Sequence, residues 1–336
     1  MSSARLARVL LRTGIGLGIS FAAVLLIAKT FDLTRTGQIL QNAGLPALGI
    51  AGLLLAADVL ARGRRWEALL RPVMPNPRAS VLPHLLVGYL VNNALPARIG
   101  EIVRCHTLGE REGMSRATVG GTVVVERLLD VAVLAVIALA ALFLTPSSGA
   151  LQVGVATAVV LSLGGAALVW RIVTGRPGDR VSRFMDRPGL RVVSSLANRV
   201  HDGLAVVRSR RSVVAAVAWS AVAWTVTGVA FAVTARFVGL ELTPPQVILF
   251  VAGVNLVAAV PAGPSNLGTF ELAAVSVAAA LGVSATQALA MAVIVHVATV
   301  AVTTTGGMLS LAYLYLAPAP RRVPAMADVS ADPRDR

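Results

Sequence analysis

Long apolar stretches with few or no charges recur along the whole chain. The longer ones lie near residues 13–29, 44–61, 117–144, 150–170, 213–236 and 285–316. Each has about 17 residues or more, long enough for an α-helix to cross a hydrocarbon core of about 30 Å. A membrane β-barrel would instead alternate polar and apolar residues in segments of about 10 residues, and this sequence does not.

Three shorter apolar segments, near 82–96, 245–262 and 267–282, each adjoin a break rich in proline and glycine. We therefore predict an all-α, polytopic membrane helical bundle with about 6–8 spans and two re-entrant or broken half-helix segments. Residues 1–316 are predicted to form this integral membrane domain. The Pro-rich, polar residues 317–336 are predicted to form a disordered cytoplasmic tail.

The composition agrees with a membrane protein and argues against a nucleic-acid partner. The chain is 56% hydrophobic with a mean hydropathy of +0.77, and only 14% of its residues are charged, against about 25% in soluble domains. Its net charge of +14 comes almost wholly from arginine, because Lys29 is the only lysine. This charge lies in short loops between apolar spans, so we expect it to contact anionic lipid and no nucleic acid.

The basic loops also predict the orientation. Arg5, Arg8 and Arg12 precede the first span, five arginines fall within residues 62–78, and ten fall within residues 171–211. The links at 30–43, 145–149 and 237–244 are nearly neutral. Short basic loops stay on the cytoplasmic side. We therefore expect a multi-pass protein of the plasma membrane whose N-terminus and 171–211 loop face the cytoplasm.

Two of the breaks follow one plan. "NNALPARIGEIVR" at 92–104 and the stretch that ends in "VPAGPSNLGTFE" at 260–271 both contain Asn, Pro, Gly and Glu in that order. These residues are Asn92, Pro96, Gly100 and Glu101 in the first, and Asn255, Pro261, Gly268 and Glu271 in the second. The intervals differ, so the likeness is one of plan and not an aligned repeat, and chance remains an alternative.

Paired breaks of this kind predict a binding site. Interrupted helices at membrane depth are tolerated only where protein or water satisfies the freed backbone groups, and their N-terminal ends attract anionic groups such as phosphate. In transporters, such segments in corresponding halves point to the substrate site. The alternative is that both breaks are ordinary surface loops in which Glu101 and Glu271 are solvated.

A charged cluster interrupts the long segment 117–144. In "VVVERLLDVAVL", Glu126, Arg127 and Asp130 are three or four residues apart and therefore share one helix face. Glu126 would lie roughly 13 Å into the span, where each charge costs about 2.5–3.5 kcal/mol and usually marks a pathway or an internal ion pair. Alternatively, the span begins later and the cluster lies at the membrane interface.

Other chemistry is poorly supported, and we expect neither a metal nor a cofactor. Cys105 is the only cysteine, and the four histidines have no HExxH spacing; they are His84, His106, His201 and His296. A histidine in an apolar helix, such as His296, is more often a packed, hydrogen-bonded residue than a ligand. No Gly-x-x-x-x-Gly-Lys loop indicates ATP hydrolysis.

The segments "LPARIGEIVR", "VVERLLD" and "PAGPSNLGTFE", followed by "ALGVSATQALAMAVIVHVATVAV", give a resemblance to a known family. In this order they resemble the transmembrane, flippase-like region of lysylphosphatidylglycerol synthases. The resemblance implies a helical membrane bundle with re-entrant segments that moves a lipid between leaflets. Bifunctional members carry an additional aminoacyl-transferase domain; we expect none here, and therefore no aminoacylation of lipid by this chain.

The resemblance and the paired breaks together give the candidate lipid- or substrate-binding residues. They are Asn92, Pro96, Arg98, Gly100, Glu101, Arg104, Glu126, Arg127, Asp130, Asn255, Pro261, Asn266, Gly268 and Glu271. Arg98 or Arg104 would hold a phosphate, because arginine binds it through two parallel hydrogen bonds. This chain departs from the family at Pro264, Ser265 and Asn266, where many relatives have a more glycine-rich turn.

Three functions remain open. The first is binding and translocation of a phospholipid or lipid-linked substrate, passively or coupled to ions or protons. The second is an intramembrane lipid-modifying transferase, and the third is a non-catalytic membrane partner subunit. As protein partners, a second copy of the chain and a separate lipid-modifying enzyme both stay open.

Overall fold

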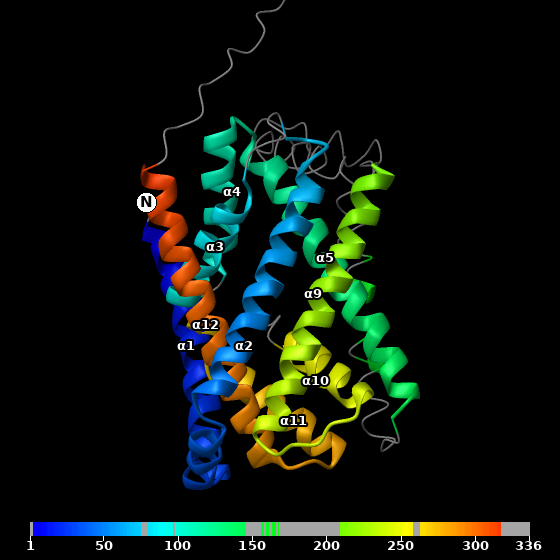
Figure 1. Ribbon diagram of the computed structural model, residues 1–336. Helices are drawn as coiled ribbons and strands as arrows, with labels where there is room; N and C mark the ends of the chain where they lie inside the picture. The colour runs from blue at the N-terminus through cyan, green and yellow to red at the C-terminus, as the bar shows by residue number, and fades with distance from the viewer. Residues whose placement is uncertain are drawn as a thin grey trace, which may run out of the picture.

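The computed structural model describes residues 3–74, 80–96, 98–145, 209–257 and 263–316, and a few positions between 156 and 167. Within these ranges every regular element is a helix (Figure 1). The long helices are α1 (Ser3–Thr30), α2 (Leu33–Leu70), α5 (Arg116–Phe143), α9 (Arg210–Phe237) and α12 (Ala285–Leu316). The short ones are α3 (Leu82–Ala94), α4 (Ile99–Glu112), α10 (Pro244–Val257), α11 (Thr269–Leu281) and the 3₁₀ turn η2 (Pro264–Asn266).

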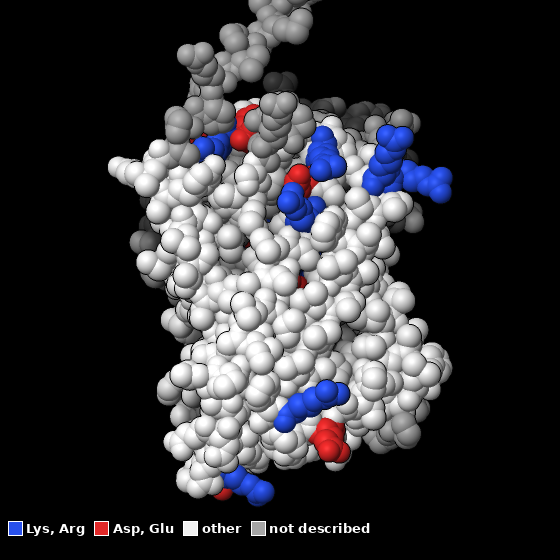
Figure 2. Space-filling view, viewed as in Figure 1, with Lys and Arg blue, Asp and Glu red and all other residues white. Residues whose placement is uncertain are grey.

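The long helices run along the length of the bundle (Figure 1). Three of those described, α2, α9 and α12, are both long enough and apolar enough to cross a membrane. Figure 2 shows that charged side chains on this face gather near its two ends, mostly at the upper one, and leave its middle nearly uncharged. The prediction of an all-α membrane helical bundle is confirmed.

The short helices form two pairs at opposite ends of the bundle. The pair α3–α4 lies in the upper half of Figure 1, where α2 ends, and α10–α11 lies in the lower half, where α9 ends. The two pairs meet through α3 and η2, which are in contact. There the Ser265 hydroxyl donates to Asn93 Oδ1 over 3.4 Å. The two interrupted segments predicted from the sequence thus come together inside the molecule.

Helix α2 differs from the sequence-based expectation at both of its ends. It begins at Leu33, inside the expected link 30–43, and accommodates Gly44 at φ 64°, a conformation that glycine adopts without strain. It ends at Leu70, so Arg62, Arg64 and Arg65 lie on helical turns and not in a loop. Arg65 is fully buried, which carboxylates on α5 make possible.

Some predictions concern residues outside the described ranges. Pro261, the cytoplasmic tail at 317–336, most of the segment 150–170 and most of the basic loop 171–211 belong to this group.

Small residues allow α12 to approach α3 closely. A Cβ atom on Gly307 would lie 2.5 Å from Leu90 Cβ and 2.7 Å from the Leu86 carbonyl oxygen. Such distances are below van der Waals contact, so only glycine fits at this crossing. Membrane helices commonly pack through small residues in this way.

We therefore expect Gly307→Ala to lower the free energy of unfolding by about 1–3 kcal/mol, the usual cost of overpacking. The matched control is Gly120→Ala in α5, where a Cβ would meet nothing within 4 Å. That substitution should be neutral or stabilising by up to about 1 kcal/mol. Equilibrium unfolding in mixed micelles measures both, and an equal response of the two variants would contradict the close packing.

Candidate functional site

A polar cavity of about 320 Å³ lies where the two pairs of short helices meet. Helices α2, α3, α5, α9 and α12 and the two breaks contribute to its lining. Seven sequence-predicted residues line it: Asn92, Arg98, Glu101, Arg127, Asp130, Asn255 and Asn266. Nine further polar residues of the lining were not among the residues predicted from the sequence: Asp58, Arg62, Tyr89, Asn93, Thr227, Ser265, His296, Thr299 and Thr303.

The break between α3 and α4 is built by tight local packing. Arg98 adopts the left-handed conformation with φ 55° and begins α4. The Gly100 amide then donates to Asn92 Oδ1 over 2.8 Å, so a side chain of α3 caps α4. A Cβ on Gly100 would overlap the Gly88 carbonyl oxygen. Gly100 and Asn92 therefore hold the break together, and Pro96 is buried within it.

Charged side chains alternate in sign along one wall of the cavity. Glu101 Oε1 lies 2.8 Å from Arg127 Nη2 and 3.9 Å from Arg98 Nη1. Arg127 Nη1 in turn lies 3.6 Å from Asp130 Oδ2. These residues remain partly accessible, apart from Asp130, so a ligand could compete for their hydrogen bonds.

Behind this wall lies a buried ion network. The Arg65 guanidinium donates to both oxygens of Asp130 and, over 2.9 Å, to Glu126 Oε1. Arg104 Nη1 donates to Glu126 Oε2 over 3.2 Å, and its guanidinium lies 4.7 Å from the centre of the Trp66 ring. The sequence predicted either an internal ion pair or an interfacial cluster at Glu126. The structure has the internal ion pair, with Glu126 and Arg104 each 1% exposed.

Arg104 and Glu126 therefore do not line the cavity. They bind each other and Arg65, which leaves Arg62, Arg98 and Arg127 as the arginines of the lining. Among the described residues, the cavity arginine that the sequence analysis missed is Arg62. One feature of the sequence pointed to Arg62: it lies four residues after Asp58, and Asp58 interrupts the apolar run 44–61.

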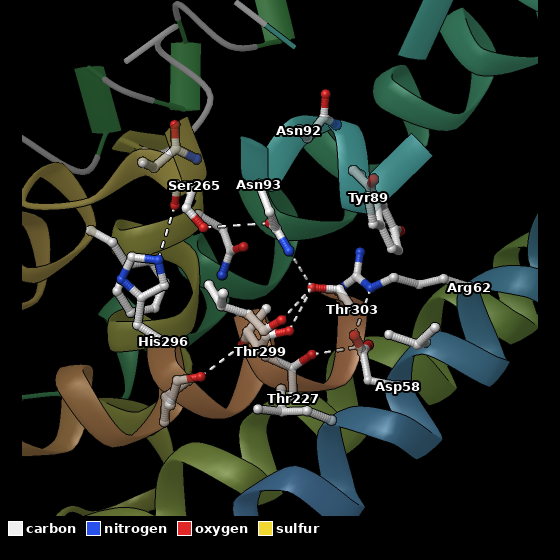
Figure 3. Close-up of a pocket in the computed structure, with 18 of the residues that line it drawn as sticks. Asp58, Arg62, Tyr89, Asn92, Asn93, Thr227, Ser265, His296, Thr299 and Thr303 are labelled. Carbon is white, nitrogen blue, oxygen red and sulfur yellow. Dashed lines mark hydrogen bonds and ion pairs between the residues drawn. The ribbon is translucent and has the colours of Figure 1, made fainter. Parts of the chain in front are cut away.

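The wall formed by α2 and α9 presents a second ion pair. Arg62 Nε donates to Asp58 Oδ2 over 2.7 Å, and the Thr227 hydroxyl donates to Asp58 Oδ1 over 3.1 Å (Figure 3). The Arg62 guanidinium lies 4.6 Å from the centre of the Trp224 ring. These contacts orient the Arg62 side chain through its Nε atom. The same side chain lines the cavity.

The second break places Glu271 inside the bundle. Glu271 is 7% exposed, and its Oε2 accepts a hydrogen bond of 2.8 Å from the Gly268 amide at the start of α11. Its Oε1 lies 2.5 Å from His296 Nδ1 on α12. The alternative of a solvated surface carboxylate is therefore wrong for Glu271, and His296 is packed and hydrogen-bonded, as the sequence suggested.

The backbone of this break is strained. Ser265 and Asn266 have φ values of 59° and 60°, in the left-handed region that non-glycine residues rarely adopt. Asn266 tolerates this region well, but Ser265 less so, and such residues cost of order 1–3 kcal/mol. The conformation turns the Ser265 carbonyl oxygen to His296 Nε2, 2.9 Å away (Figure 3).

An apolar groove of about 880 Å³ adjoins the polar cavity. Helices α1, α2, α11 and α12 line it, together with Gly268 and Glu271. Three of its apolar side chains, Leu33, Leu267 and Val297, are about half exposed, so the groove opens at the surface of the bundle. Cavity and groove share Asn93, Ser265, His296 and Val300 as a common wall.

Within the described residues, no three His, Cys, Asp or Glu side chains converge as metal ligands would.

Comparison with known proteins agrees with this architecture. The sequence profile of the lysylphosphatidylglycerol synthase TM region matches residues 14–307, which include both breaks and the α5 cluster. The chain belongs to this family. A curated relative from Haloferax volcanii, the glycosyltransferase AglD, is 24% identical over 357 residues. The alignment covers 96% of this chain but 56% of AglD, so the chain spans little more than half of that relative. No solved structure matches.

Family membership and the apolar helices make this a membrane protein with a lipid-related function.

The Arg65 network gives a prediction for stability. Arg65→Met should lower the free energy of unfolding by about 3–5 kcal/mol, because it leaves Glu126 and Asp130 buried without their main partner. Equilibrium unfolding in mixed micelles measures the change.

The control is Arg64→Met, since Arg64 is largely exposed and pairs with Glu67 at the surface; it should cost at most about 1 kcal/mol. Adding Glu126→Gln and Asp130→Asn to Arg65→Met should recover part of the loss. Similar small effects of the two single substitutions would show that the buried network does not stabilise the bundle.

Proposed function

We propose that this protein binds a phospholipid or lipid-linked substrate with its headgroup in the polar cavity and moves it between the two leaflets. The observation that carries the proposal is a charged cavity inside an otherwise apolar bundle, sharing a wall with an apolar groove. Charged groups at membrane depth are costly and usually line a substrate pathway. A lipid is the ligand that has both a charged part and an apolar part.

The cavity charges suit a headgroup with an anionic group and a hydroxyl or amine. Three arginines face three carboxylates across the lining: Arg62, Arg98 and Arg127, and Asp58, Glu101 and Asp130. Arginine binds phosphate through parallel N–H donors, and carboxylates accept hydrogen bonds from hydroxyl or ammonium groups. A headgroup carrying both would replace some internal ion pairs with ion pairs of its own, so little charge would be left uncompensated.

The two pairs of short helices supply a route from either side. The pairs α3–α4 and α10–α11 are re-entrant in this proposal, each entering from one membrane face and turning near the cavity. Transporters built from such segments expose a fixed central site to the two sides in turn. In this proposal, the site that is exposed to the two sides in turn lies at the contact between α3 and η2.

The charge distribution supports a cytoplasmic location for the upper end. Described basic residues of that end are Arg64, Arg71, Arg111, Arg116, Arg210 and Arg211, while the lower end has Lys29, Arg35 and Arg236. By the positive-inside rule, the N-terminus then faces the cytoplasm in the plasma membrane. The basic upper end would rest against anionic lipid.

A second candidate is an intramembrane transferase acting on a lipid. The observation in its favour is that AglD is named a glycosyltransferase and that carboxylates line the cavity here. AglD is much longer than the matched region, however, and its activity need not reside there. An enzyme would convert a lipid-linked donor in detergent, where no leaflets exist, whereas a translocator would not.

Filling the cavity tests translocation without changing any charge. Thr299→Phe places a ring in the lining on α12, where it takes up space that the headgroup would occupy. Because the close-packed surroundings offer no other room, the substitution should lower the translocation rate by about an order of magnitude or more. The assay follows labelled phospholipid and polyprenyl lipid between the leaflets of proteoliposomes.

Leu309→Phe on the outer surface of the same helix, where Leu309 is 67% exposed, is the matched control and should keep the wild-type rate. The proposal fails if the wild-type protein moves none of these lipids, or if Thr299→Phe leaves the rate unchanged.

A further inference from the structure

The wall between cavity and groove contains several polar links, and the His296–Glu271 pair is one of them. His296 belongs to both the cavity and the groove, and it joins α12 to the start of α11 through Glu271 and to η2 through the Ser265 carbonyl. Phe270 packs against the His296 ring, with ring centres 4.9 Å apart. His296 therefore links three elements at this wall: α12, η2 and the start of α11.

The hydrogen bonds that Glu271 and His296 make determine how many protons the pair carries. The Ser265 carbonyl oxygen can only accept, so His296 Nε2 carries a hydrogen. Glu271 Oε2 already accepts from the Gly268 amide. One hydrogen must therefore lie between Glu271 Oε1 and His296 Nδ1, which are 2.5 Å apart. It belongs either to an imidazolium or to a neutral carboxylic acid.

In either form the pair holds one proton more than a neutral imidazole beside a carboxylate. An imidazole that keeps a single hydrogen cannot donate to both the Glu271 carboxylate and the Ser265 carbonyl oxygen, so loss of the proton breaks one of the two contacts of His296. Glu271 would keep its bond to the Gly268 amide at the positive end of α11, which stabilises an ionised carboxylate. His296 therefore separates from η2 or from Glu271, the two partners that it joins to α12.

We propose that Glu271 and His296 form a proton-binding latch between the polar cavity and the apolar groove. With the proton bound, the latch is closed and separates the two compartments. When the proton leaves to water reached through the cavity, the contact of α12 with η2 or with the start of α11 opens and the headgroup can pass sideways between cavity and groove. The latch rests on the proposed function and supplies its coupling ion.

The neighbouring titratable side chains do not share the proton of the Glu271–His296 pair. The other titratable side chains that line the polar cavity are Asp58 and Arg62 on α2, Tyr89 on α3, Arg98 and Glu101 at the start of α4, and Arg127 and Asp130 on α5. Within the described residues, none of them is ion-paired or hydrogen-bonded to Glu271 or His296. The lining residues from α1, α9 and α10 include no titratable side chain.

Glu271→Gln imitates the protonated latch. Its amide nitrogen can donate to His296 Nδ1 at any pH, and its oxygen can accept from the Gly268 amide. Spin labels at Leu267 and Val297, both half-exposed in the groove, report the opening by pulsed electron paramagnetic resonance. The labels are introduced as Leu267→Cys and Val297→Cys in a Cys105→Ala background, with the full chain in lipid nanodiscs.

We expect a short label distance in the wild-type protein at about pH 5 and a second, longer population by about pH 9. In Glu271→Gln the short distance should persist across this range, whereas Glu241→Gln, which changes an exposed carboxylate, should respond like the wild type. His296→Leu should show the long distance throughout. A wild-type distance that ignores pH, or a Glu271→Gln variant that follows the wild type, would overturn the latch.

Lipid retained by the same samples, measured by native mass spectrometry, separates the two proposals. Lipid bound without a pH response would overturn the latch and leave lipid binding in place. A pH response with no lipid bound by the wild type would leave the latch and count against the proposed function.

Discussion

Two carboxylates on α5, Glu126 and Asp130, hold a fully buried arginine, Arg65, near the end of α2. A charge in hydrocarbon costs several kcal/mol unless it is paired, so α2 and α5 must adopt the one arrangement in which these groups meet. Glu126 also binds Arg104 of α4. The same pairing therefore anchors a short helix that has too few residues to cross the membrane by itself, and the α3–α4 pair depends on it for its place in the bundle.

The polar cavity follows from this anchoring. Because the network fixes α4 against α5, Arg98 and Glu101 at the start of α4 are held beside Arg127. From the opposite end, η2 reaches Asn93 of α3, and the Ser20 hydroxyl of α1 accepts from the Gly263 amide. Asp130 belongs both to the buried network and to the cavity lining, whereas the other charged groups that face the cavity are distinct from those that hold the bundle together. A ligand can compete for the charged groups of the cavity other than Asp130 without disrupting the buried network.

The sequence predicted the helical class, both breaks and the α5 cluster, because apolar length, Pro/Gly interruptions and charge spacing are local signals. It placed Arg65 in a basic loop, since nothing local distinguishes an arginine that ends a span from one that follows it; only the partners on α5, more than 60 residues later, decide the matter. Arg62, Asn93 and Ser265 were missed for the same reason, as each acquires its role from a distant helix. Either Arg98 or Arg104 was predicted to hold a phosphate; Arg98 lines the cavity, whereas Arg104 pairs with Glu126 and does not.

The proposed function requires that a lipid headgroup occupies the cavity between the two breaks. A photoreactive phenylalanine analogue at Tyr89, which lines the cavity, tests it in native membranes, with the same replacement at Tyr315, which is 89% exposed, as the comparison. We expect position 89 to capture lipid with a narrow choice of headgroup, while position 315 captures the membrane's bulk lipids. Capture of no lipid at position 89, or of the bulk mixture at both positions, would contradict it.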